Sequence, residues 1–267
     1  MDVRGCARIA DRASFVTTRV DDRKLDRNEK PTGCYHSRMS LLAEMLPTIL
    51  PDDPLPTALS WLTEAWAKRN QPNPNAMALA TVDATGRPSA RIVLCKEIVT
   101  SPGYVAFYTN YQSHKGQDLA ANPRAAVVLH WDHQHRQVRM EGHVLMAPGS
   151  DSDDYFASRP WQRRVGAWAS AQSRPVLSHA MLQQAVAKTA RRFGAPEPGP
   201  ENDQRDVTVA IARPPYWGGY RLWVDAVELW VEGESRIHDR ARWQRPLLAV
   251  GADECRFGPW TATRLQP

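Results

Sequence analysis

Cysteine and long hydrophobic runs are the features that this sequence has least of. The four cysteines, Cys6, Cys34, Cys95 and Cys255, lie far apart and form no CxxC pair. With no secretory signal in front of them, we expect reduced thiols in a cytoplasmic protein. No apolar run approaches the roughly 18 residues that a transmembrane helix needs, which excludes a membrane span. No internal repeat is found, so a repeat architecture is not expected.

Runs of basic residues are missing too, although the 267-residue chain carries a formal net charge of +5. Ten tryptophans could stack on single-stranded nucleic acid, but no basic run or RNA-binding motif supports that function. A moderately basic balance also suits a protein that binds phosphorylated small molecules. We therefore expect no nucleic-acid partner.

Three histidines, His130, His133 and His135, have a spacing that a metal site could use. They surround a predicted hairpin turn, and no carboxylate or cysteine of recognised spacing accompanies them. No metal site is expected.

The first 38 residues mix arginine with aspartate and show no apolar period that would form a buried face. The segment is too acidic for a mitochondrial presequence. We expect a disordered extension at residues 1–38 that carries no chemistry, with translation starting at Met39 as the alternative. Residues 39–267 are expected to form one domain.

Periodicity along residues 39–267 predicts a mainly β protein with helical insertions, of the α+β class. Apolar residues Leu59, Leu62 and Trp66 recur at helical spacing, with Thr57 available as an N-cap. Helices are expected at residues 56–69, 113–121, 151–158 and 177–193, the last with Leu177 and Met181 on its apolar face. Strands are expected at residues 76–82, 90–98, 104–108, 125–131, 137–145, 220–230, 236–243 and 260–265. A Pro-rich loop is expected at residues 194–206. Strands before and after the helices indicate one sheet, large enough to close into a barrel.

Two segments combine cations with strand or helix ends. On the predicted strand 90–98, Arg91 and Lys96 fall on opposite faces and could meet different anions, or could be solvated strand ends. In the segment around Ser113, His114 and Lys115, a strand ends and a helix begins. Free backbone donors, a hydroxyl and an ammonium make a phosphate site there, with a simple N-cap as the alternative.

Two further segments add arginines and aromatic rings. Residues 155–173 contain Tyr155, Arg159 and Arg163, which suit a phosphate, although a surface helix with solvated arginines is the better interpretation of this segment taken alone. Residues 217–221 read WGGYR and residues 236–240 read RIHDR. If residues 236–240 are a strand, His238 lies between two guanidiniums on one face, an arrangement that needs an anionic ligand.

Taken in chain order, these four segments resemble the pyridoxamine 5′-phosphate oxidase family from about residue 75 to residue 267. The most specific parts of the resemblance are WGGYR and RIHDR, together with the ending at residues 260–267. The resemblance implies an FMN-binding split β-barrel and a homodimer with FMN across the subunit interface. It also implies oxidation of pyridoxamine 5′-phosphate or pyridoxine 5′-phosphate by O2 to pyridoxal 5′-phosphate, with release of H2O2.

The resemblance also assigns residues. The implied FMN contacts are Arg91, Ile92, Val93, Lys96, Tyr108, Thr109, Ser113, His114, Lys115, Gln137, Gln172, Ser173, Trp230 and Arg240. The implied substrate contacts are Lys96, Tyr155, Arg159, Arg163, Arg236, Ile237 and His238, with Arg236 and His238 as the catalytic pair.

Two positions depart from the family pattern. His114 stands where the family usually has arginine, and Arg163 stands where it commonly has serine. An oxidase of the phenazine-biosynthesis type and a split-barrel protein that holds flavin or haem without turnover are the alternatives. Retention of Lys96, Tyr155, Arg159 and RIHDR favours the vitamin B6 substrate.

Overall fold

The structure is a computed structural model that describes residues 44–199, 209–251 and 254–267. The predicted extension at residues 1–38 lies outside the described residues, as does part of the predicted loop at 194–206. In chain order the elements are α1 (Leu55–Lys68), β1 (Ala76–Val82), β2 (Pro88–Leu94), β3 (Glu97–Val99), β4 (Tyr104–Asn110), α2 (His114–Ala121), β5 (Arg124–Trp131), the 3-10 turn η1 (Asp132–Gln134), β6 (Arg136–Met146), α3 (Gly149–Ala157), α4 (Trp161–Ala169), α5 (His179–Arg192), β7 (Trp217–Val231), the 3-10 turn η2 (Glu234–Arg236), β8 (Asp239–Gln244), β9 (Leu247–Val250), β10 (Cys255–Phe257) and β11 (Thr261–Leu265). The mainly β class with helical insertions is confirmed. No helix in the described part of the chain is both long and apolar enough to cross a bilayer.

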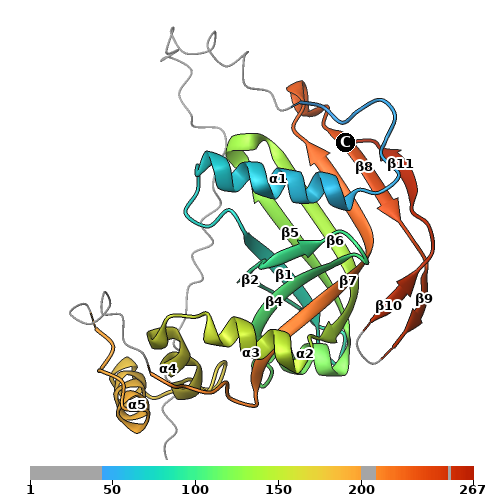
Figure 1. Cartoon of the computed structure of the whole chain (residues 1–267). Coiled ribbons are helices and arrows are strands. Elements are labelled where there is room, and N and C mark those ends of the chain that lie inside the picture. The colour runs from blue at the N-terminus through green and yellow to red at the C-terminus, as the bar shows by residue number, and fades with distance from the viewer. Residues whose placement is uncertain (1–43, 200–208, 252–253) are drawn as a thin grey trace, which may run out of the picture. The chain divides into compact units, whose positions relative to one another are not determined.

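Strand β7 organises the nine-stranded sheet because its two halves have different neighbours (Figure 1). One edge pairs with β4 through residues 217–223 and then with β8 through residues 226–231. The other edge pairs with β6, with an irregular register between Glu141 and Gly142. A Cβ on Gly142 would lie 1.9 Å from the Trp223 carbonyl oxygen, so only glycine allows this close approach. This change of partner along one edge of β7, from β4 to β8, fits the expected split barrel.

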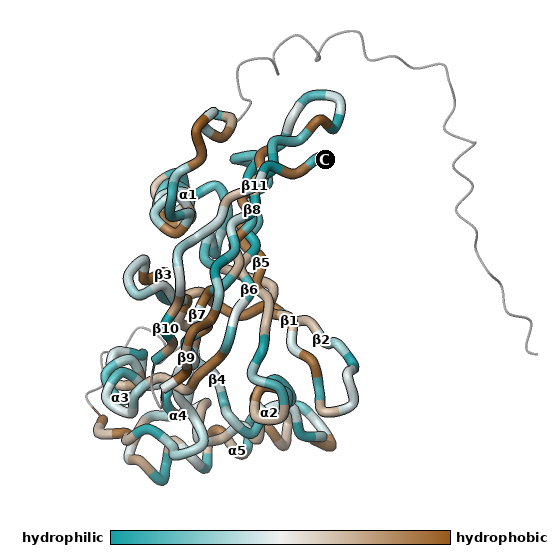
Figure 2. Tube along the Cα trace, turned by 90° about the vertical axis from the view of Figure 1, so that its right-hand side faces the viewer, coloured by the Kyte–Doolittle hydropathy of each residue, from teal (hydrophilic) through white to brown (hydrophobic). Residues whose placement is uncertain are grey.

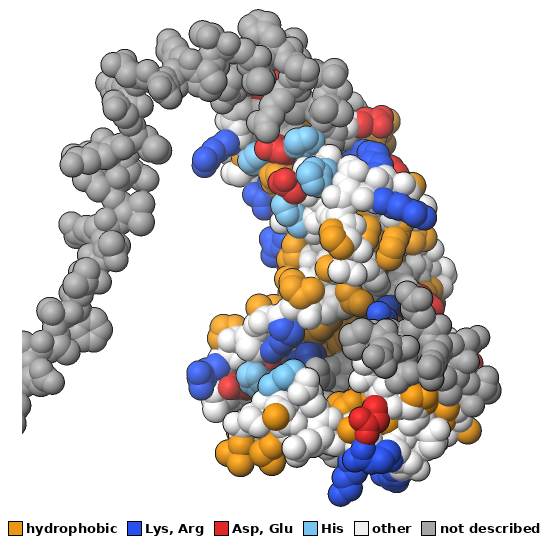
Figure 3. Space-filling model, turned by 90° about the vertical axis from the view of Figure 1, so that its left-hand side faces the viewer, with side chains coloured by type: hydrophobic (Ala, Val, Ile, Leu, Met, Phe, Trp, Pro, Cys, Tyr) orange, Lys and Arg blue, Asp and Glu red, His pale blue; other side chains and the backbone are white. Residues whose placement is uncertain are grey.

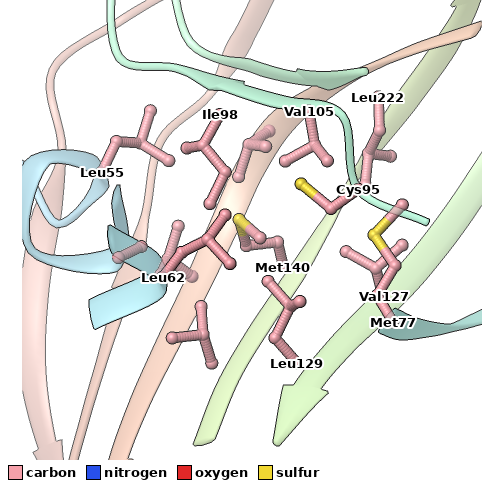
Figure 4. Close-up of a cluster of buried hydrophobic side chains, with 14 of the residues drawn as sticks. Leu55, Leu62, Met77, Cys95, Ile98, Val105, Val127, Leu129, Met140 and Leu222 are labelled. Carbon is pink, nitrogen blue, oxygen red and sulfur yellow. The ribbon is translucent and has the colours of Figure 1, made fainter. Parts of the chain in front are cut away.

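Helix α1 packs on the sheet and closes the main core. Leu55 and Leu62 point from α1 toward Met140 and Leu129 of the sheet (Figure 4), and hydrophobic segments follow β4 and β7 in Figure 2. The predicted contact face was wrong in part, because Leu59 and Trp66 are exposed. The buried stripe instead consists of Leu55, Ala58, Trp61, Leu62 and Ala65, in which the alanines allow close approach.

The start of α1 was also predicted wrongly. The helix begins at Leu55, before Thr57, and Thr57 makes no capping hydrogen bond. The Leu55 amide donates instead to the Asp53 carboxylate at 2.9 Å. The Asp53 carboxylate satisfies the free Leu55 amide, so the helix can begin at Leu55, earlier in the chain than predicted.

A second, smaller core lies under the late helices. It contains Phe156, Trp161, Val165, Ala190 and Trp217. Helix α4 falls in the segment for which a solvated surface helix was the alternative, and its buried Trp161 and Val165 make it part of this core instead.

The predicted apolar face of α5 was wrong at its start. Leu177 precedes the helix and is 91% exposed, and Met181 is also exposed. Val186 and Phe193 do pack against the second core. The short hairpin of β9 and β10 was not predicted, and its strand β9 is exposed along its length.

The strand predicted at residues 90–98 is broken in two. The Cys95 amide donates to the Asn75 carbonyl at 2.8 Å, on the side of β1, whereas the Lys96 amide donates to the Ala106 carbonyl of β4 at 2.8 Å. The chain thus leaves one neighbour and joins another between these two residues. The alternation of faces predicted for Arg91 and Lys96 ends at this crossing.

Candidate functional site

A pocket of about 700 Å³ lies where β2, the end of β4, the start of α2 and the segment from α3 to α4 meet. This volume is in the range of small-molecule sites. Its lining residues are Ser89, Ala90, Arg91, Ile92, Val93, Leu94, Lys96, Tyr108, Thr109, His114, Lys115, Tyr155, Arg159, Arg163, Gln172, Ser173 and Trp217. Figure 3 shows basic and histidine side chains around the hollowed lower part of one face.

One end of the pocket is built on the first turn of α2. Ser113 caps this helix, accepting from the Gly116 amide at 3.4 Å, so the N-cap that was considered as the alternative is present. The Lys115 ammonium donates to the Thr109 hydroxyl at 3.1 Å and to the Ser113 hydroxyl at 3.2 Å. Lys115 is buried, and no described carboxylate forms an ion pair with it. A buried ammonium held only by hydroxyl groups is prepared for an anion.

The electrostatics of Lys115 point the same way. Burial lowers the pKa of its ammonium, and the nearby Arg91 lowers that pKa further, while Asp118 acts in the opposite direction. A bound anion would relieve both effects, because it compensates for lost hydration and attracts the two cations.

Behind this end lies a buried carboxylate that holds Arg91. Asp118 is 3% exposed and accepts from the Thr81 hydroxyl at 2.6 Å and from the Ser89 hydroxyl at 3.1 Å. The same carboxylate also pairs with the Arg91 guanidinium, with a nitrogen 3.5 Å from the carboxylate oxygen. The His114 Nε2 atom lies 3.4 Å from the other Asp118 oxygen. Asp118 therefore orients both basic groups at the mouth of the pocket.

The other end of the pocket combines cations with stacked aromatic rings. The rings of Tyr108, Tyr155 and Trp217 stack, with 4.0 Å between the centroids of the two tyrosines. The Lys96 ammonium lies 5.3 Å from the centre of the Tyr155 ring, and the Arg159 guanidinium lies 4.7 Å from that of Trp217. Such contacts hold the cations while leaving their hydrogen-bond donors for a ligand.

Arg159 has an unsatisfied donor in this pocket. Its Nη1 atom is buried and has no hydrogen-bond partner among the described residues. Burial lowers the pKa of the guanidinium, and the like charge of Arg163 lowers it further, against the opposing effect of Tyr155. A half-buried guanidinium whose buried donor has no partner favours an anionic ligand.

The charges that line the pocket have one sign. Five cations line it, namely Arg91, Lys96, Lys115, Arg159 and Arg163, and none of the lining residues is acidic. Of these five, only Arg91 forms an ion pair with a described carboxylate. The pocket therefore suits phosphate groups, with room for one at each end. Arg91 and Lys96 thus line the same pocket, and the prediction that each meets a different anion stays a prediction.

A second group of predicted residues lies on another part of the sheet. Gln137 of β6 pairs with Trp230 of β7, and Trp230 pairs with Arg240 of β8. The three side chains therefore share one face of the sheet. The Arg240 guanidinium donates to the buried Glu228 carboxylate at 2.8 and 3.0 Å, which fixes its orientation.

The RIHDR segment does not have the geometry predicted for it. Strand β8 begins only at Asp239, and Arg236 ends the 3-10 turn η2 with a φ of 65°. Arg236 and His238 are therefore not on one strand face with Arg240, because alternation requires extended backbone. The Arg236 side chain is exposed and has no hydrogen-bond or ion-pair partner within the described chain.

Most predicted site residues thus come together, but not all. Between Arg91 and Ser173, all predicted FMN and substrate residues line the pocket except two, Ser113 and Gln137. Ser113 lies directly behind the pocket, within hydrogen-bond distance of Lys115. Besides Ser113, the predicted residues that do not line the pocket are Gln137, Trp230, Arg236, Ile237, His238 and Arg240. Sequence reasoning missed Trp217 and the supporting Asp118. WGGYR was a signal for Trp217, because Gly218 and Gly219 make room for Tyr111 and Tyr108 beside it.

Comparisons with known proteins agree on one family. Residues 62–192 match the family described as pyridoxamine 5′-phosphate oxidase. Residues 217–267 match the pyridoxine 5′-phosphate oxidase C-terminal dimerisation region, which supports a homodimer. A pyridoxine/pyridoxamine 5′-phosphate oxidase of Cupriavidus necator is 45% identical over 230 residues, which are 86% of this chain and 96% of that protein.

Solved structures support the split-barrel fold. The structure of PhzG from Burkholderia lata 383, in complex with tetrahydrophenazine-1-carboxylic acid, has a TM-score of 0.67 at 27% identity and covers 84% of this chain and all of its own. A pyridoxamine 5′-phosphate oxidase-related, FMN-binding protein of Nostoc punctiforme has a TM-score of 0.56 at 15% identity, with 82% of this chain and all of its own covered. The chain has the split-barrel fold and belongs to the pyridoxamine 5′-phosphate oxidase family.

Proposed function

We propose that this chain uses FMN to oxidise pyridoxamine 5′-phosphate and pyridoxine 5′-phosphate to pyridoxal 5′-phosphate, with O2 as the acceptor and H2O2 as the second product. The observation that carries the proposal is the pocket with cations at both ends and no acidic lining residue. FMN and the substrate each bring one phosphate, so a site for the pair needs two anion-binding ends. The family match supplies the reaction class.

The end formed by α2 suits the FMN phosphate. Lys115 and Ser113 would bind it together with the helix N-terminus, while Asp118 holds Arg91 toward the same end. The same pocket is also lined by Ile92, Val93, Tyr108, Thr109, Gln172 and Ser173, along which the flavin would extend.

The end formed by Lys96, Tyr155 and Arg159 suits the substrate phosphate. Arg159 supplies a buried donor without a partner, and Lys96 adds a second cation. Arg163 lines the same end without a described carboxylate beside it. We assign it as an additional phosphate contact.

We propose that a second subunit completes the site. Gln137, Trp230 and Arg240 lie outside the pocket of their own chain. Trp230 and Arg240 are in the region that matches the dimerisation model, and Gln137 is on β6 beside them. In a homodimer with FMN at the interface, these residues and the RIHDR turn of one subunit would border the pocket of the other. Gel filtration with and without FMN would test the dimer.

The protein's part in the reaction is to bind and orient. FMN, when bound, supplies the acceptor for the hydride from C4′ of the substrate and is reoxidised by O2. The exposed Arg236 guanidinium would hold the substrate against the flavin. His238 would orient the substrate or Arg236. Ile237 is exposed beside them and would contact the pyridine ring.

An oxidase of the phenazine type is the second candidate, favoured by the similarity to PhzG. The ligand in that structure is a carboxylic acid without phosphate, whereas this pocket has three cations at the end away from α2. Turnover of pyridoxine 5′-phosphate should exceed turnover of unphosphorylated pyridoxine and of a tetrahydrophenazine carboxylate. Faster turnover of the phenazine substrate would reverse the assignment.

Affinity for FMN should fall at alkaline pH because the pKa of Lys115 is lowered below the ordinary 10.5. The bound phosphate dianion raises that pKa, so binding takes up a proton in the window between the two pKa values. Within this window affinity should decrease by up to about tenfold per pH unit. Fluorescence titration with FMN at increasing pH measures the effect.

Two controls isolate Lys115. Riboflavin lacks the phosphate, so its affinity should stay nearly constant over the same range. Lys115→Arg keeps its charge at these pH values and should remove most of the decline. Tyr108 does not interfere, because burial raises its pKa to about 12. An equal decline for FMN and riboflavin would contradict the role of Lys115.

The substitution His114→Arg should increase FMN affinity by about three- to tenfold, since an arginine adds permanently charged, forked donors at the phosphate end. The His114 side chain is 60% exposed, so a longer side chain has room. Equilibrium titration of the apoprotein measures the change, and His114→Gln serves as the neutral control. Weaker FMN binding by His114→Arg would contradict this expectation. It would mean that His114, through its contact with Asp118, helps to hold Arg91 in place.

We further propose that residues 39–267 form the working domain in the cytoplasm and that residues 1–38 are dispensable. A variant that starts at Met39 should retain the kcat and FMN affinity of the full chain. A large loss of either would assign a role to the extension.

A further inference from the structure

The turn between β7 and β8 contains an unusual run of backbone conformations. Ser235 and Arg236 are consecutive residues with positive φ, at 53° and 65°. Residues with a Cβ rarely adopt this left-handed region, because it brings the side chain against the backbone. Such strain persists only where the surroundings impose it, and it is concentrated at functional sites.

Gly233 is the residue that lets this turn close. A Cβ at position 233 would lie 1.8 Å from the Ile237 carbonyl oxygen and 2.6 Å from its carbon. The backbone of Gly233 is extended, with a φ of −113°, so the requirement for glycine here is one of space. The chain therefore returns against Gly233 immediately before His238.

The same turn fixes the imidazole of His238. The Gly233 amide lies 3.3 Å from the His238 Nδ1 atom, with the amide as donor. A backbone N–H can only donate, so Nδ1 must be the acceptor and cannot carry a proton. The proton of the neutral ring is then on Nε2. The His238 ring also lies 4.6 Å from the Trp230 ring, which limits its rotation.

We propose that Gly233 is a positioning residue that holds His238 as the Nε2–H tautomer, so that its imidazole presents a hydrogen-bond donor to the ligand. The closed turn also places the unpaired Arg236 guanidinium on the exposed side of the same loop. In this arrangement a neutral His238 offers no basic nitrogen to the substrate, because Nδ1 is occupied by the amide. The proposal rests on the proposed function for the identity of the ligand, but not for the tautomer.

The direct test is a long-range 1H–15N spectrum of the protein labelled in histidine, recorded above the ordinary histidine pKa of about 6.5. His238→Gln assigns the signal among the eight histidines. The expected result is the Nε2–H pattern for His238 in the wild-type protein. A pattern with the proton on Nδ1 would overturn the proposal.

Gly233→Ala tests the cause. The added methyl group must push Ile237 away, so we expect His238 to show an averaged tautomer and kcat to fall at least tenfold, with KM changed much less. Gly149→Ala is the matched control, because a Cβ there meets nothing within 4 Å, and it should change neither readout. A Gly233→Ala protein with the wild-type tautomer and kcat would overturn the proposal.

A second pair of variants tests the backbone at Ser235 in case Gly233→Ala does not fold. Ser235→Gly adopts positive φ without strain and should retain the Nε2–H pattern. Ser235→Val resists that conformation and should lose the pattern. Identical spectra for both variants would overturn the proposal. The spectra need no substrate, so failure of the proposed oxidation would appear separately, as a wild-type Nε2–H pattern without turnover.

Discussion

Replacing Arg236 with alanine should lower kcat for pyridoxine 5′-phosphate by about a thousandfold, because positioning against the reacting partner accounts for several orders of magnitude in rate. FMN affinity should stay within about twofold, since the phosphate end of the pocket is built from other residues and Arg236 has no partner in the described structure. Stopped-flow reduction of the flavin under anaerobic conditions measures the step directly.

Arg236→Lys is the matched control for charge without the forked geometry. It should recover part of the rate, because an ammonium replaces the charge but not the planar donor pair. If Arg236→Ala loses FMN but keeps normal specific activity once it is loaded, then Arg236 is a flavin residue and its assigned role is wrong.

Replacing Arg159 with methionine should raise KM for pyridoxine 5′-phosphate by about 10- to 100-fold, which corresponds to the roughly 1.5–3 kcal/mol of a hydrogen bond to a charged group. The guanidinium has a buried donor that is unpaired among the described residues, and the substrate phosphate is the expected acceptor. Methionine retains the contact with Phe156 and Trp217 that the arginine makes. Steady-state kinetics at saturating FMN give the change.

Two controls locate the effect at the phosphate. Turnover of unphosphorylated pyridoxine should be almost unchanged by Arg159→Met, and Arg163→Ser should raise KM by less, because Arg163 is more exposed and more easily screened. If the variant keeps a normal KM but binds FMN more weakly, then Arg159 contacts the flavin phosphate and its assigned role is wrong.

Local sequence signals predicted the strands and the phosphate-binding helix end well. Strand β1 has the predicted bounds, and Ser113 caps α2 as expected, because alternation and capping depend on neighbouring residues. The five predicted cations Arg91, Lys96, Lys115, Arg159 and Arg163 line one pocket, and their roles as ligand contacts stay predictions. The family resemblance implied that Arg91 and Lys96 share one site, but the strand pattern alone did not. The backbone changes its pairing partner from the β1 side to β4 between Cys95 and Lys96, and strand periodicity does not show such a change.

The RIHDR segment shows the opposite case. Its residue types suggested an anion-binding site, but period-two alternation placed His238 between two arginines, and the left-handed pair at Ser235 and Arg236 removes that alternation. Positive φ at residues other than glycine has little local signal. Asp118 was missed for a related reason, because its partners Thr81, Ser89 and Arg91 come from distant strands.

The most direct test of the account is to add pyridoxine 5′-phosphate under air to the purified, FMN-loaded protein and to follow pyridoxal 5′-phosphate and H2O2 together. We predict both products in equal amounts. Without O2, the bound flavin should yield at most one equivalent of pyridoxal 5′-phosphate and no H2O2. Absence of both products from protein that demonstrably holds FMN would contradict the proposed oxidase function.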